Sequence, residues 1–261
     1  MQKIRYERQG AVARIVMNDP GTLNAADPVM VQEMSQAFER ASKEARCVLL
    51  TGEGRGFCSG ANLSSGEDRA VDESGRIDLG DRLEKQYNPF ILALRDLPIP
   101  IVTAVNGPAA GIGCSFALMG DLVFAGESAY FLQAFRRIGL IPDGGATFML
   151  PRLVGRARAL EMMLLGDKVP AKQAESWGLI YRCVPDGELQ AQAMAKADEL
   201  ANGPTRALSL IRKLAWASAD NSLEEQLAAE RAAQRHAGHS NDFTEGVSAF
   251  LQKRPARFTG D

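Results

Sequence analysis

The hydrophobic positions near the start of the chain form two short apolar runs with a helical pattern between them. Residues 11–18 (AVARIVMN) alternate in polarity and predict a strand, and residues 44–52 (EARCVLLTG) predict a second, buried strand. Between the two, Asp27 is a suitable N-cap, Pro28 follows at the first helical position, and apolar residues then recur at helical spacing. The pattern predicts a strand, a helix and a strand in that order.

An uncharged stretch over residues 97–120 (LPIPIVTAVNGPAAGIGCSFALMG) is long enough to cross a bilayer. Pro98, Pro100, Asn106 and Pro108 would break such a helix and leave backbone polar groups unsatisfied in lipid. We therefore predict a buried strand, a turn, and a helix over residues 111–119 that ends at Gly120. Residues 121–126 (DLVFAG) predict a further strand.

Strands that are apolar on both faces and alternate with helices imply a sheet covered on each side, so the predicted fold class is α/β. Beyond residue 184 the pattern becomes helical, with amphipathic stretches over 188–203, 204–219 and 222–237 before a tail over 242–258. We predict an α/β core over residues 1–184 and a C-terminal helical subdomain over residues 185–261.

Composition narrows the range of partners. The 261 residues are 46% hydrophobic, and 30 basic residues nearly balance 32 acidic ones. No charge excess favours nucleic acid or an anionic membrane as a partner, so a small ligand is expected. The four cysteines lack the spacing of a disulfide framework or a zinc site, which favours a cytoplasmic location; they are Cys47, Cys58, Cys114 and Cys183.

Several kinds of catalysis find no support in the residues. The chain has two histidines, His236 and His239, both in a charged helical segment, so Ser115 has no evident base and no metal site is predicted. The loop over residues 51–60 (TGEGRGFCSG) matches neither a dinucleotide fingerprint nor a phosphate loop. Its glycines can instead expose backbone N–H groups that bind an anion or an oxyanion.

Two glycine-rich loops each follow a buried strand, at residues 54–63 (GRGFCSGANL) and 104–113 (AVNGPAAGIG). Together with GTLNAAD near the start, the block around IPDGG and the closing tail, this pair resembles the crotonase, or enoyl-CoA hydratase/isomerase, superfamily. The resemblance covers almost the full chain. It implies a β-β-α superhelix with a C-terminal helical subdomain, a homotrimer or a dimer of trimers, and an acyl-CoA thioester as substrate without any other cofactor.

The resemblance also implies which residues meet the thioester. The backbone amides of Ala61 and Ile112, which follow Gly60 and Gly111, would hold the thioester oxygen as it becomes an enolate. Ile112 stands where the family commonly has glycine. Residues expected along the coenzyme A path are Leu23, Ala25, Ser59, Asn62 and Leu63, and Lys253 and Phe258 of the tail are expected to approach the coenzyme A of a neighbouring subunit.

The proton-carrying positions of the family are altered here. Hydratases of this superfamily use two glutamates, and their positions fall on Ser115 and Phe135, neither of which can carry a proton in that role. Asp143 remains, and its IPDGG context resembles family members that isomerise enoyl-CoA or ring-epoxide CoA substrates with an aspartate at this place. One carboxylate is enough to move a proton from C2 to C4 of an enoyl thioester. We therefore expect an enoyl-CoA isomerase in which Asp143 shuttles the proton.

Asp143 also has structural alternatives, because aspartate is a preferred N-cap and Pro-Asp-Gly is a turn sequence. Hydrogen bonds from a helix N-terminus would lower its pKa, whereas an apolar pocket of Phe135, Ile138 and Leu140 would raise it.

Two further readings of the whole protein stay open. The first is an enoyl-CoA hydratase of fatty-acid or aromatic-acid degradation, which would recruit an acid such as Asp68, Glu73 or Asp81 from a polar segment. The second is a non-catalytic acyl-CoA-binding protein that kept the fold.

Overall fold

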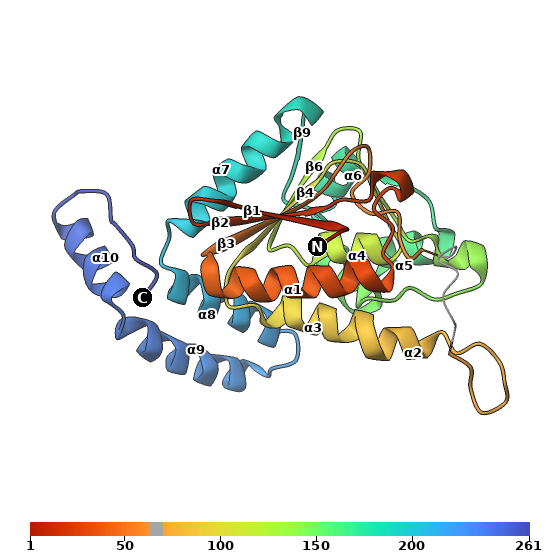
Figure 1. Cartoon of the computed structure of the whole chain (residues 1–261). Coiled ribbons are helices and arrows are strands. Elements are labelled where there is room, and N and C mark those ends of the chain that lie inside the picture. The colour runs from red at the N-terminus through yellow and green to blue at the C-terminus, as the bar shows by residue number, and fades with distance from the viewer. Residues whose placement is uncertain (63–69) are drawn as a thin grey trace.

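Six strands form the main sheet, in the order β1-β2-β3-β4-β6-β9 (Figure 1). The computed structural model describes residues 1–62 and 70–261. β1 runs antiparallel to β2, and every other pair in this sheet is parallel. The strands are β1 (Ile4–Gln9), β2 (Val12–Met17), β3 (Cys47–Gly52), β4 (Ile101–Val105), β6 (Leu122–Gly126) and β9 (Arg182–Val184).

The central strands are buried on both faces, which explains their continuous apolar sequence. Every residue of β3 and β4 is buried. The strands predicted over residues 11–18, 44–52 and 121–126 are confirmed as β2, β3 and β6. Sequence patterning missed β1, because this edge strand has only its first residue buried and carries polar side chains along the rest.

Helices cover both faces of the main sheet, as the α/β class requires (Figure 1). One core lies between the sheet and helices that include α1, α3 and α4, and a second core lies under α7, which packs on β3 and β4. The helices are α1 (Pro28–Glu44), α2 (Gly80–Arg82), α3 (Asn88–Asp96), α4 (Ile112–Leu118), α5 (Ala146–Leu165), α6 (Ala171–Ser176), α7 (Leu189–Ala201), α8 (Thr205–Ala217), α9 (Leu223–Gly238) and α10 (Asn241–Leu251).

The first helix begins as the sequence predicts. The carboxylate of Asp27 accepts a hydrogen bond from the Met30 amide, at 2.8 Å, and Pro28 occupies the first turn. α1 therefore has a side-chain N-cap, and its apolar face lies on the sheet.

Residues 97–120 form a strand, a turn and a helix, which confirms the prediction of buried structure. β4 is followed by the short strand β5 (Pro108–Ala110) and then by α4. A second sheet joins β5 to β7 (Tyr130–Leu132), and β7 to β8 (Val169–Pro170). Within the described residues, no helix is both long and apolar enough to span a membrane.

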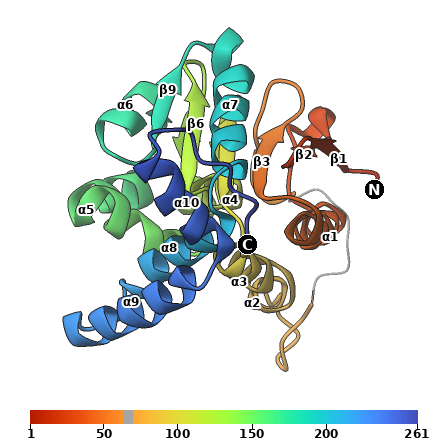
Figure 2. The same ribbon diagram turned by 90° about the vertical axis from the view of Figure 1, so that its left-hand side faces the viewer.

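The three amphipathic stretches beyond residue 184 form α7, α8 and α9, and the tail adds α10. α9 contacts both α8 and α10, and Figure 2 shows these three helices together at one end of the molecule. α7 takes part in the sheet's second core through Ala193, Ala197 and Ala201. The division of the chain into a core over residues 1–184 and a C-terminal subdomain over residues 185–261 stays a prediction.

A buried arginine fixes α8 to the rest of the fold. The side chain of Arg212 is 5% exposed, and its Nε lies 2.7 Å from Asp121 Oδ1. Its two terminal nitrogens donate to backbone carbonyls at the end of α3, including Leu94 and Leu97. Asp121 in turn accepts a hydrogen bond from the Ile101 amide at the start of β4. Arg212 therefore ties α8, α3 and two neighbouring strands together.

We predict that Arg212→Ala lowers the free energy of unfolding by about 3–5 kcal/mol, because it leaves the Asp121 carboxylate and several carbonyls without their partner. Denaturant unfolding of both proteins at equal concentration measures this. Arg206→Ala on the same helix is the control, since Arg206 makes one long ion pair, 3.9 Å, with Asp261; it should change the value by less than about 0.5 kcal/mol. Equal effects of the two substitutions would contradict the structural role of Arg212.

Candidate active site

The two glycine-rich loops lie side by side because their backbones pair. The Ala110 amide donates to the Cys58 carbonyl at 2.9 Å, and the Cys58 amide donates to the Pro108 carbonyl at 3.0 Å. Gly60 has a φ of +105°, and a Cβ there would lie 3.1 Å from the Ala110 carbonyl oxygen. Glycine at position 60 thus allows the positive φ and leaves room for the two loops to approach each other closely.

The amide of Ala61 lies between two paired neighbours. The Ala26 amide donates to the Gly60 carbonyl at 2.8 Å, and the Asn62 amide donates to the Ala26 carbonyl at 3.0 Å. Across the ranges that the structure describes, the Ala61 amide itself donates no hydrogen bond. It is a backbone donor held in place by its neighbours and left available.

The amide of Ile112 is available for a different reason. Ile112 is the first residue of α4, where N–H groups have no acceptor within the helix, and Gly111 turns the chain into this helix with a φ of +53°. The Ile112 side chain is buried, and a Cβ on Gly144 would lie 2.2 Å from its Cδ1. The side chain is thus directed into the core against Gly144.

Asp143 lies in a tight turn directly ahead of α5. The Ala146 amide donates to the Asp143 carbonyl at 3.1 Å, and Gly144 and Gly145 both have positive φ, +59° and +80°. The N-cap of α5 is Gly145, and no side chain caps this helix. The expectation of a turn is therefore met by the Asp143 backbone, and the alternative that its carboxylate caps the helix is wrong.

The turn is attached to the first turns of α4. Ser115 donates a hydrogen bond from Oγ to the Asp143 carbonyl oxygen at 3.0 Å. Gly144 also packs so closely that a Cβ there would lie 2.9 Å from Ser115 Cβ. Ser115, which the resemblance matches with a glutamate of the family's hydratases, therefore positions the backbone of Asp143 relative to the Ile112 amide.

Burial raises the pKa of Asp143 from 3.8 to about 6, against a smaller lowering by a hydrogen bond from its own backbone amide. Its Oδ1 is buried without a hydrogen-bond partner among the described residues. The apolar pocket expected from Ile138 and Leu140 is not its cause, because these side chains are 55% and 39% exposed. The carboxylate is thus able to change its protonation state near neutral pH.

Phe135 lies beside Gly111, at the N-terminus of α4. It belongs to η3 (Ala134–Ile138), is half-buried, and its Cζ would lie 3.6 Å from a Cβ on Gly111. An aromatic ring therefore stands beside the loop at the position of the second missing glutamate.

The residues expected along the coenzyme A path come together in part. The Ser59 amide donates to the Leu23 carbonyl at 3.0 Å, and the Ala25 amide donates to Thr22 Oγ1 at 3.2 Å. Asn62 continues from Ala61 along the same segment, while Leu63 lies outside the described residues. The loop over residues 22–25 thus borders the segment that carries the Ala61 amide.

The residues expected from the tail lie elsewhere. Lys253 is exposed, and the ring of Phe258 packs on Gly246 of α10, with Cε1 3.4 Å from where a Cβ would be. Figure 1 shows α10 at the opposite end of the molecule from α4 and α5. The fold does not bring Lys253 or Phe258 to Asp143 of the same chain, and their approach to a neighbouring subunit stays a prediction.

The alternative acids that the structure describes are exposed or paired with another side chain. Glu73 is exposed, and Asp81 is paired with Lys85 at 2.5 Å between Oδ1 and Nζ. Asp68 lies outside the described residues.

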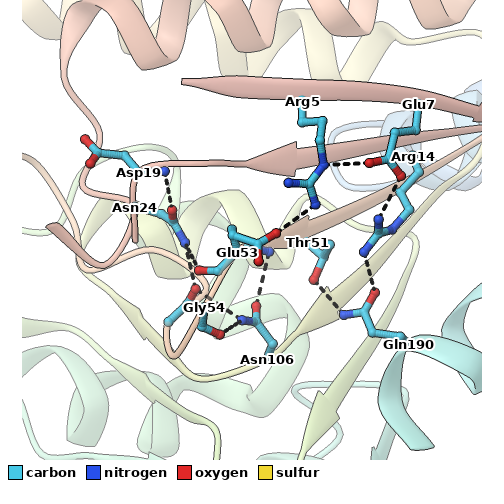
Figure 3. A network of polar contacts seen from close by, with 12 residues as sticks. Arg5, Glu7, Arg14, Asp19, Asn24, Thr51, Glu53, Gly54, Asn106 and Gln190 are labelled. Carbon is cyan, nitrogen blue, oxygen red and sulfur yellow. Dashed lines mark hydrogen bonds and ion pairs between the residues drawn. The ribbon is translucent and has the colours of Figure 1, made fainter. Parts of the chain in front are cut away.

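Sequence reasoning missed two asparagines that hold the first loop from both sides (Figure 3). Asn24 Nδ2 donates to the Gly56 carbonyl at 2.8 Å, and Asn106 Nδ2 donates to the Gly54 carbonyl at 2.9 Å. Asn106 Oδ1 also accepts a hydrogen bond from the Gly52 amide at 3.1 Å. The available signal was an asparagine in each of GTLNAAD and AVNG, since this residue type satisfies loop backbone and tolerates positive φ, here +58° at Asn24.

Sequence reasoning also missed Tyr87, the last residue of the π-helical turn η2 (Leu83–Tyr87). Its hydroxyl donates to the Ala26 carbonyl at 3.2 Å, next to the Ala61 amide. Its buried ring meets Phe116 of α4 edge-on, with 6.4 Å between ring centroids. Tyr87 therefore contacts Ala26, which pairs with Ala61, and the helix that presents the Ile112 amide. These long-range contacts leave no spacing signal in the sequence.

Comparisons with known proteins show the family of this chain. The family model of enoyl-CoA hydratase/isomerase matches residues 7–261. The "probable enoyl-CoA hydratase" of Rhodobacter capsulatus is 44% identical over 257 residues, which cover 98% of each chain. The 1,2-epoxyphenylacetyl-CoA isomerase of Escherichia coli K12 is 44% identical over 263 residues, which cover 100% of this chain and 99% of that one.

Solved structures extend the likeness to the fold. An enoyl-CoA hydratase from a Polaromonas species superposes with a TM-score of 0.89 at 30% identity, over 98% of this chain and 99% of that chain. An enoyl-CoA hydratase from Bacillus anthracis superposes with a TM-score of 0.91 at 27% identity, over the whole of both chains. The chain therefore has the crotonase fold and belongs to the enoyl-CoA hydratase/isomerase family.

Proposed function

We propose that this protein isomerises the double bond of an acyl-CoA thioester, from C3–C4 to C2–C3. The observation that carries the proposal is one half-buried acid, Asp143, whose Oδ1 is buried and whose backbone carbonyl is held by Ser115 of the helix that presents the Ile112 amide. Serine and phenylalanine occupy both positions where the superfamily's hydratases have glutamates. The substrate is a coenzyme A thioester, and the reaction requires no additional cofactor.

The reaction balances with one acid. The Asp143 carboxylate removes a proton from C2, and the electron pair moves into the thioester carbonyl to form a dienolate. The resulting carboxylic acid then returns the proton to C4, where the C3–C4 π electrons form the new C–H bond. The C1–C2 π electrons of the dienolate shift to C2–C3, and the carbonyl is restored. A group whose pKa is about 6 is ionised at neutral pH, so it can take the C2 proton, and it is then the acid that protonates C4.

The amides of Ala61 and Ile112 supply the second contribution. Both donors are fixed by the fold before substrate binds, so they need no reorganisation as negative charge develops on the thioester oxygen. Loss of one such donor typically costs about 2.7–4 kcal/mol of transition-state stabilisation, and a positioned base contributes about 10²–10⁴ in rate. The two loops thus matter as much as the acid.

Hydration would require a second proton-carrying group in the site. Adding water across C2–C3 needs a base for the water and an acid for the α-carbon, and Asp143 can serve as one of these. Among the described candidates, Glu73 is exposed and Asp81 is paired with Lys85. The chemistry of one acid therefore favours isomerisation over hydration.

The comparison with the Escherichia coli relative supports a second candidate, isomerisation of an epoxide thioester. That protein is named a 1,2-epoxyphenylacetyl-CoA isomerase and is 44% identical over nearly the full length of both chains. A single acid beside an oxyanion site also suits this reaction. Turnover of a 3-enoyl-CoA, of an epoxide thioester or of neither separates the two candidates from a non-catalytic acyl-CoA-binding protein.

The proposed assembly is a homotrimer or a dimer of trimers. Lys253 and Phe258 lie on the tail, away from Asp143 of their own chain. In this proposal they contribute to the coenzyme A site of a neighbouring subunit.

We predict that Asp143→Asn lowers kcat for a 3-enoyl-CoA by about 10²–10⁴, because the amide cannot take up the C2 proton. Steady-state assays that follow formation of the conjugated thioester measure this. Asp167→Asn is the matched control, since Asp167 is an exposed acid at the end of α5. Turnover by Asp143→Asn within threefold of the unsubstituted protein would reject the proposed function.

We also predict the pH dependence. Asp143 must be ionised in the free enzyme to act as a base, and its pKa is about 6. The value of kcat/KM for a 3-enoyl-CoA should therefore be constant above pH 7 and fall about tenfold per pH unit below pH 6. A profile that is flat between pH 5 and 7.5 would show that Asp143 is not the titrating base.

A further inference from the structure

A cavity of about 800 Å³ lies between α3, the first turn of α5 and α8. Its volume is within the range of small-molecule sites, about 300–1,000 Å³. It is distinct from the loops that carry the Ala61 and Ile112 amides, since neither residue lines it. We call it the α3–α8 cavity.

The inner wall of the α3–α8 cavity is apolar. Its side chains come from α3, the end of α4, α5 and α8, and they include Ile91, Met119, Phe148, Met149, Trp216 and Ala217. Such a wall suits hydrocarbon, because burial of apolar surface is favourable and a buried polar group here would lack a partner.

Three of the charged side chains that line the cavity have partners, and Lys213 and Asp220 are exposed. Arg95 pairs with Asp96 at 2.8 Å, and both side chains are exposed, 43% and 64%. The Arg212 guanidinium is committed to Asp121 and to carbonyls of α3, so it holds α8 in place without offering a free charge. The cavity therefore has a charged mouth and an apolar interior.

Gly145 connects the cavity to the candidate active site. It lines the cavity and follows Asp143 by two residues, a backbone distance of at most about 7 Å. Its φ of +80° favours glycine, and a Cβ there would lie 3.9 Å from Ile91 Cγ2 and 3.7 Å from Met149 Cε. The part of the cavity between Ile91 and Met149 thus lies directly beside the turn that contains Asp143.

The α4 helix gives a second measure of reach. Its first residue, Ile112, presents the amide, and Met119 after its last turn lines the cavity. Seven helical residues span about 10 Å. A thioester held at Ile112 and reacting beside Asp143 therefore has the cavity within reach of the carbons beyond its reacting centre.

We infer that the α3–α8 cavity holds the distal part of the acyl group, and that the substrate is an apolar acyl thioester of medium-chain size, linear or ring-bearing. The inference rests on the proposed function for where the thioester lies. A four-carbon acyl group ends at C4, where Asp143 acts, and leaves the cavity to water. Ala217 on α8 and Met149 on α5 would limit the length that fits.

The test compares two saturated thioesters, butyryl-CoA and decanoyl-CoA, by calorimetric binding. The unsubstituted protein should bind decanoyl-CoA at least tenfold more tightly than butyryl-CoA. Ala217→Phe fills the cavity and should reduce that ratio of dissociation constants at least tenfold. Ala215→Phe, on the exposed side of the same helix, should leave the ratio as it is. Each ratio of dissociation constants comes from a single preparation, so partial unfolding of a variant would not by itself change it. Ala217→Leu repeats the test with a smaller side chain.

The outcomes test the binding of the acyl group in the cavity separately from the isomerase reaction. Saturated thioesters cannot be isomerised, so their binding does not depend on the reaction assigned to Asp143. An unchanged ratio in Ala217→Phe and Ala217→Leu, or equal affinities in the unsubstituted protein, would overturn the cavity assignment. If the affinity ratio shows the expected tenfold changes but the protein turns over no 3-enoyl-CoA, the cavity assignment is supported and the proposed isomerase activity is rejected.

Discussion

The contact between Gly144 and the first turns of α4 determines how the rest of the site is arranged. A side chain at position 144 would collide with Ile112 and Ser115, so only glycine lets the Asp143 turn lie there. The hydrogen bond from Ser115 to the Asp143 carbonyl then fixes the turn on the helix. One close approach thus sets the position of the acid relative to the Ile112 amide, and the pairing of the two loops adds the Ala61 amide.

Burial of Asp143 links reactivity to stability. In the folded chain its pKa is about 6, against 3.8 for a solvated aspartate, so the folded state holds its proton more tightly than the unfolded state. Stability from this group is present below pH 3.8 and is lost as the pH rises through 6, which at pH 7 lowers the free energy of unfolding by about 2–3 kcal/mol. The fold offsets this cost elsewhere, in its two apolar cores and at Arg212.

Sequence patterns predicted the elements whose signals are local, and missed those that depend on distant partners. The cap at Asp27 and the buried strand β3 follow from neighbouring residues, as does the turn at Asp143. Tyr87 and Asn106 act through residues far along the chain, and no spacing encodes such contacts. The direction of the Asp143 pKa shift also needed the fold, because the expected walls at Ile138 and Leu140 are exposed.

The central claim is that one carboxylate moves the same proton from C2 to C4. Isotope transfer tests it most directly: a 3-enoyl-CoA deuterated at C2 is converted in ordinary water, and the product is analysed for deuterium at C4. The account predicts that part of the label reaches C4, because the same carboxylate, whose Oδ1 is buried, takes the C2 proton and delivers it to C4. Product from the unsubstituted protein whose C4 hydrogen comes entirely from solvent would contradict the account. So would an undiminished rate in Asp143→Asn.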